Sequence, residues 1–161
     1  MTNVDQQPTP VDYQRAAALI SHRADASVEG MRYIAGEASQ AGRTTALLIA
    51  TIAAYLHIIG ELRTESARTA IDEYLAISAG QHIALDARRA AIAAIAVRDG
   101  DTEAFNAVTA EANARGRAAH LAGAVLDLFS GLLPELGTPT GLRSLTAWCA
   151  GWSALGDSGD V

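Results

Sequence analysis

The sequence predicts an all-α protein, a mostly antiparallel bundle of four to five long helices followed by a short C-terminal helix. No proline occurs between Val11 and Leu133, alanine is abundant, and apolar residues recur at steps of three and four. Proline interrupts helices and alanine has the highest helix propensity, so these features together favour long helices. A tandem array of helical hairpins is the alternative arrangement.

Residues 10–155 are expected to form one helical domain, between a flexible N-terminal segment, 1–9, and a flexible tail, 156–161. In a chain of 161 residues roughly two thirds of the unfolded surface can be buried, so stability requires no disulfide or metal. Hydrophobic residues make up 50% of the chain and charged residues 19%, a balance that leaves no room for a long disordered region.

The first helix is expected to begin at Pro10, because Thr9 and Asp12 can form a capping box around it. Its apolar stripe continues to Gln40, which predicts one helix of about thirty residues. Gly42 then supplies the left-handed stop that many helix ends use.

Two long helical patterns contain weak points. In the pattern over 10–40, Asp25 and Gly30 leave a break as an alternative. The pattern over 101–133 is expected to form a second long helix, with Gly116 as its weakest point.

The segment from Thr44 is apolar nearly all round through Ile59, which predicts a core helix contacted from several sides. Its most apolar part, 46–59, has fourteen residues, fewer than the ~18 needed to span a bilayer. A break is expected near Thr64, followed by an amphipathic helix that ends at Gly80.

The next helix is expected over 83–97, stopped by Gly100, with Asp101 capping its successor. After Pro134, the pair Thr138-Pro139 restarts a short helix. One face of this helix carries Leu142, Leu145, Trp148, Cys149 and Trp152.

The formal charge of −6 argues against nonspecific nucleic-acid binding, which depends on neutralising phosphates. All twelve basic residues are arginines, and this excludes phosphate-loop and Schiff-base lysines. The N-terminus does not resemble a secretory signal, and the single cysteine, Cys149, excludes an internal disulfide. We therefore expect a cytoplasmic protein without a membrane span.

A pocket around Tyr55, His57 and Glu61 is the main candidate for small-molecule binding. His57 and Glu61 lie one turn apart in the most apolar helix, so they could share a hydrogen bond or a cation. A buried imidazole beside a carboxylate could also act as a general base. The commoner outcome for such a histidine is a structural role, so no catalytic residue is assigned.

Arg88 and Arg89 are the candidate anion ligands, because planar guanidinium groups suit phosphates and carboxylates. Arg115 and Arg117 form a second basic cluster. Asp86 and Glu111 lie close enough in sequence to pair with these arginines instead. The four histidines form no Glu-x-x-His pairs, so neither a metal nor another cofactor is expected.

Trp148 and Trp152 are the candidate interface residues, because tryptophan is enriched at binding hot spots and the two lie one turn apart. Tryptophan is also common in hydrophobic cores, where it has a structural role. We expect the structural role for Trp148 and favour Trp152 as the partner contact.

The leading hypothesis is a non-enzymatic helical interaction module: a scaffold, adaptor or inhibitor that binds a protein partner or forms a homodimer. The chain has more apolar residues than the packing of one bundle seam requires, which leaves apolar surface for a partner. The alternative is a small-molecule or anion-binding bundle, which could be an enzyme. A transcriptional regulator is a weaker alternative.

Overall fold

The computed structural model describes residues 6–80 and 84–157, and for Cys149 and residues 152–157 it describes the backbone alone. Within these ranges the regular structure is entirely helical and contains no strand. The all-α class is therefore confirmed. The flexible segments expected at 1–9 and 156–161 fall mostly outside the described residues.

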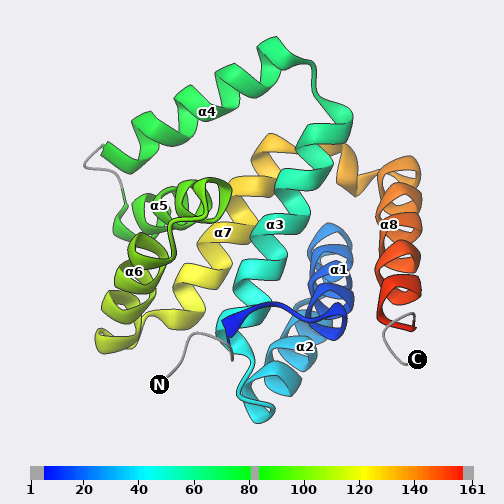
Figure 1. Cartoon of the computed structure of the whole chain (residues 1–161), viewed down its shortest axis with the longest axis horizontal. Helices are drawn as coiled ribbons and strands as arrows, with labels where there is room; N and C mark the ends of the chain where they lie inside the picture. Colours follow the sequence, from blue (N-terminus) through cyan, green and yellow to red (C-terminus); the bar gives the residue numbers. More distant parts are fainter. Residues whose placement is uncertain (1–5, 81–83, 158–161) are drawn as a thin grey trace. The chain divides into compact units, whose positions relative to one another are not determined.

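Eight α-helices follow one another along the described chain, with a short 3₁₀-helix before the last (Figure 1). They are α1 (Pro10–Ala24), α2 (Val28–Gln40), α3 (Thr44–Leu62), α4 (Glu65–Gly80), α5 (Leu85–Asp99), α6 (Thr102–Ala114), α7 (Ala118–Leu132), η2 (Pro134–Gly137) and α8 (Pro139–Asp157). The helices are more numerous than the four to five long ones expected, because both long patterns are interrupted.

The chain divides into two compact units. Unit 1 comprises Met1–Ala54 and Pro134–Val161, and unit 2 comprises Tyr55–Leu133. In unit 1, α1 packs against α2, α8 and η2. In unit 2, α5 packs against α4, α6 and α7. The single domain expected over 10–155 stays a prediction.

The helix expected over 10–40 is two helices. Ala26 has a φ of 54°, and the Ser27 side chain accepts a hydrogen bond from the Gly30 amide at 3.2 Å. A left-handed residue cannot continue a right-handed helix, and the serine caps the new one. The break therefore follows Asp25, whereas Gly30 lies in the first turn of α2.

The helix expected over 101–133 is also two helices, because Gly116 has a φ of 65° and ends the first of them. The break near Thr64 is confirmed, and the Thr64 hydroxyl accepts a hydrogen bond from the Ala67 amide at 3.3 Å. The cap at Asp101 is confirmed as well, since its carboxylate accepts from the Ala104 amide at 2.9 Å.

The helices α3 and α8 have 19 residues each, so α3 ends where the break near Thr64 was expected, whereas α8 is longer than the short helix expected. Gly151 does not interrupt α8, because an interior glycine costs only about 1 kcal/mol relative to alanine. By length and composition α3 could cross a bilayer, so the argument from a fourteen-residue run is wrong. Half of its most apolar window is buried in the fold, and one such helix is weak evidence for a membrane span.

Candidate functional site

The structure separates Tyr55 from the two residues expected to share its pocket. Tyr55 is buried, and its ring stacks on Phe129 of α7 with 4.7 Å between ring centroids. His57 and Glu61 are exposed. The burial inferred for His57 from its apolar neighbours is wrong, because the helix turns this side chain outward. Tyr55 therefore lies on a covered side of α3, and His57 and Glu61 lie on an exposed side.

Arg89 is the centre of a network that joins α5, α6 and α7. Its side chain is 2% exposed and donates hydrogen bonds to Asp86 at 3.1 Å and to Glu111 at 2.9 Å. Arg117, which precedes α7, donates to the same Asp86 carboxylate. Glu111 also pairs with Arg115 at 3.4 Å. Asp86 and Glu111 therefore pair with these arginines, which is the alternative to anion binding that their spacing in the sequence allowed.

The two carboxylates of this network are held in the ionised state. The hydrogen bond from Arg117 lowers the pKa of Asp86, and the hydrogen bond from Arg89 lowers the pKa of Glu111. The same bond from Glu111 raises the pKa of Arg89. An ionised carboxylate bound by guanidinium groups is a weak general base, so these residues are suited to holding helices together.

The two candidate anion ligands are both engaged within the fold. Arg89 is bound by two carboxylates, and Arg88 donates from Nε to the Ala79 carbonyl at 3.0 Å, just before the end of α4. An anion at Arg89 would have to displace a carboxylate that is already bound there. The network therefore gives no support to an anion site at these two arginines.

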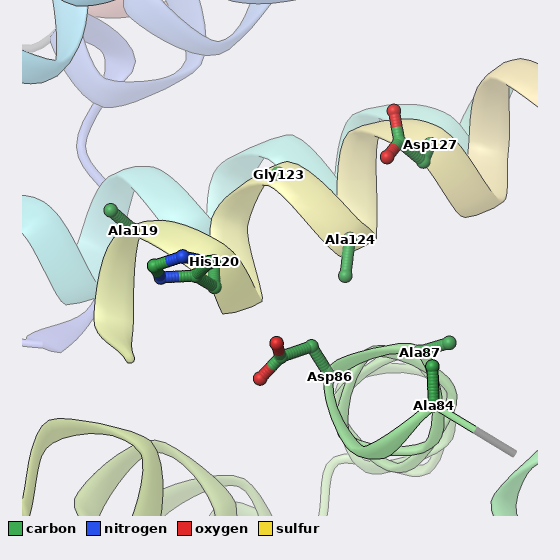
Figure 2. Close-up of a pocket in the computed structure, with 8 residues that line it drawn as sticks. All are labelled: Ala84, Asp86, Ala87, Ala119, His120, Gly123, Ala124 and Asp127. Atoms are coloured by element: carbon green, nitrogen blue, oxygen red, sulfur yellow. The ribbon is translucent and has the colours of Figure 1, made fainter. Parts of the chain in front are cut away.

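An open groove of about 500 Å³ lies between α5 and α7. Small side chains form most of its lining, with Asp86, His120 and Asp127 as its polar members (Figure 2). In Figure 2 Asp86 reaches from α5 toward α7, whereas Asp127 points away from α5. No pattern in the sequence predicts this groove, because it depends on how two helices that begin 33 residues apart pack against each other.

The outer face of α4 carries two large exposed hydrophobic residues of unit 2, Tyr74 and Ile77. We define it by Ala67, Ala70, Tyr74 and Ile77, and its two large side chains are 50% and 55% exposed. Leu75 and Ser78 are the buried residues of α4, Ala67 is partly covered, and α5 is the helix against which α4 packs. Figure 1 shows α4 apart from α6 and α7. The sequence grouped all the apolar residues of α4 on one side, whereas the structure divides them between two.

The two candidate interface tryptophans lie on α8. The Trp148 ring meets Tyr13 of α1 edge to face, with centroids 6.1 Å apart and planes at 86°. This contact agrees with a structural role for Trp148. The side chain of Trp152 lies outside the described residues, so its role as a partner contact stays a prediction.

Histidines and carboxylates do not gather into a metal site in the described residues. His22 packs against Gly30, and His120 lines the groove between α5 and α7. His82 lies outside the described residues. Comparison of the chain with protein-family models, with curated proteins and with solved structures finds no match.

Proposed function

We propose that this chain is a non-enzymatic, cytoplasmic protein-interaction module, a scaffold, adaptor or inhibitor, that docks a partner on the outer face of α4. The observation that carries the proposal is the exposure of Tyr74 and Ile77, three residues apart on a helix whose other side is already packed against α5. Contiguous exposed apolar surface rimmed by polar residues is typical of interaction sites.

The chemistry of this face suits protein binding. Tyrosine is enriched at binding hot spots because its ring buries a large area at a small entropic cost, while its hydroxyl stays hydrated. Glu65, Ser66, Thr69 and Glu73 are exposed polar residues of the same helix and would form the rim. The ionised Asp86 carboxylate that lines the groove is bound by Arg89 and Arg117, which favours a structural role for it over a catalytic one.

A photo-crosslinking residue placed at Ile77 tests this proposal in the native host. The matched control carries the same residue at Glu103, an exposed position on α6 in the same unit. We expect a discrete crosslinked protein product from position 77 and none from position 103. Crosslinking at neither position, or equally at both, would contradict docking on α4.

A second candidate function is small-molecule binding in the groove between α5 and α7, favoured by its size, which lies in the range of ligand sites. Gly123 lines the groove, and an added Cβ there meets nothing within 4 Å. The Gly123→Val substitution should therefore narrow the groove without disturbing the helices. A compound that raises the Tm of the wild type but not of this variant would support the second candidate, and equal shifts in both proteins would exclude the groove.

A further inference from the structure

We infer that the partner on the outer face of α4 is a second copy of this chain, packed as an antiparallel α4 helix. This inference rests on the proposed function and adds the identity and direction of the partner. It is carried by the order of small and large side chains along the face.

The four residues of the face are spaced by three, four and three positions. This is the spacing of the first and fourth positions of a heptad, the seam along which two helices pack with interlocking side chains. The seam has two small residues, Ala67 and Ala70, in the N-terminal half of α4. Its two large residues, Tyr74 and Ile77, follow in the C-terminal half. The seam is therefore narrow at one end and wide at the other.

This order fits a second copy in one direction. A parallel pair would set Tyr74 against Tyr74 and Ala70 against Ala70, so the helix axes would have to diverge along the seam. An antiparallel pair centred on the level of Asp72 sets Tyr74 against Ala70 of the second copy and Ile77 against its Ala67. Each layer then holds one large and one small side chain, at one constant separation of the axes.

The arrangement has the twofold symmetry of most homodimers, in which one surface patch contacts itself. The contact between the two copies involves one helix of 16 residues from each, so it is at most roughly 24 Å long. A seam of this length buries less than the ~800 Å² per partner of a typical stable interface. The dimer is therefore expected to form reversibly as the protein concentration rises.

The flank of the seam adds a specific electrostatic consequence. Glu73 is exposed and lies beside the seam, close to the proposed twofold axis. The two copies of Glu73 therefore approach each other, and like charges so placed weaken association. The Glu73→Gln variant should dimerise with a lower dissociation constant than the wild type.

A large-to-small exchange across the seam provides the decisive test. Tyr74→Ala leaves a gap and Ala70→Tyr creates a clash, so each single variant should raise the dissociation constant at least about tenfold in sedimentation experiments. The double variant Ala70→Tyr/Tyr74→Ala restores one large and one small side chain in each layer and should dimerise like the wild type. Ala70 and Tyr74 are both exposed, so the variants are expected to fold, which circular dichroism checks.

Thiol crosslinking tests the direction of packing in a Cys149→Ser background. Glu73→Cys should crosslink to itself through a short bifunctional maleimide. Ser66→Cys should not, because the two copies of residue 66 would lie about 18 Å apart along the seam. Equal crosslinking of the two variants, or a double exchange that fails to restore dimerisation, overturns the antiparallel homodimer. If position 77 then still captures a different protein, the proposed function stands and only the self-pairing fails.

Discussion

The aromatic rings of Tyr55 and Phe129 lie nearly parallel, with 7° between their planes, and both side chains are buried. This stack ties α3 to α7 in unit 2. Phe129→Ala removes it and leaves a cavity, so the free energy of unfolding should fall by about 3 to 5 kcal/mol in urea denaturation. Phe129→Leu retains most of the volume and should cost less. An alanine variant as stable as the wild type would contradict the structural role of the stack.

Trp148 should contribute to folding and leave association unchanged. Its ring packs edge to face on Tyr13, but the residue is only half-buried, so Trp148→Ala should cost less than a core tryptophan, about 1 to 3 kcal/mol. Chemical denaturation and light scattering should be measured on the same sample. A change in the dissociation constant without a loss of stability would make Trp148 an interface residue.

Asp86 should be more important for stability than an exposed aspartate with a similar arginine pair. Its carboxylate accepts from Arg89 and Arg117 and so joins α5 to the start of α7, whereas Asp99 pairs with Arg98 at the surface. Asp86→Asn should lower the Tm by several degrees, and Asp99→Asn should change it little. Equal losses in the two variants would show that the network adds nothing beyond a surface pair.

Acid should destabilise unit 1 through Asp12. Burial raises the pKa of this carboxyl, but hydrogen bonds from Arg43 at 2.6 Å and from Thr9 outweigh it, so the net pKa lies below 3.8. A pKa that is lower in the folded than in the unfolded chain gives stability that is complete well above 3.8. That stability is lost as the pH falls through the folded-state pKa.

The measurement is the Tm of the wild type and of Asp12→Asn from neutral pH to below 3.8. The variant should be less stable at neutral pH, and the difference between the two proteins should shrink in acid. Asp25→Asn, an exposed change of equal charge, is the control. A difference that stays constant across this range would refute the contribution of the ionised Asp12.

Two glycines of α2 should respond oppositely to alanine. A Cβ at Gly30 would lie 2.3 Å from Nδ1 and 2.5 Å from Cγ of His22, so Gly30→Ala should lower the Tm. A Cβ at Gly36 meets nothing within 4 Å, and Gly36→Ala should raise stability by up to about 1 kcal/mol through helix propensity. Adding His22→Ala to Gly30→Ala should recover part of the loss. If the double variant is no more stable than Gly30→Ala, the loss of stability does not come from the contact with His22.

The helical class and most helix ends were predictable from sequence because they depend on local chemistry. Asp101, Gly42 and Gly100 act within one turn of the chain, and the structure uses all three at helix ends. The break after Asp25 was harder to place. It depends on Ala26 in a left-handed conformation, for which alanine carries no local signal.

The candidate site was less predictable because it depends on tertiary contacts. The apolar neighbours of His57 suggested burial, yet which side of an all-round apolar helix is covered depends on the elements packed against it. Similarly, the apolar residues of α4 outnumber what one packed side needs, and sequence alone could not divide them between Leu75 on the inner side and Tyr74 on the outer one.

The discontinuity of unit 1 sets an order for folding during synthesis. Unit 2 is one continuous stretch, Tyr55–Leu133, so the ribosome has delivered all of it before α8 exists. The helix α1 can pack against α2 early, but its contact with α8 forms only after the intervening chain is made, and closing so long a loop carries an entropic cost. Nascent chains that stall before Pro139 would hold a complete unit 2, while the surface of α1 that contacts α8 would still be open to chaperones.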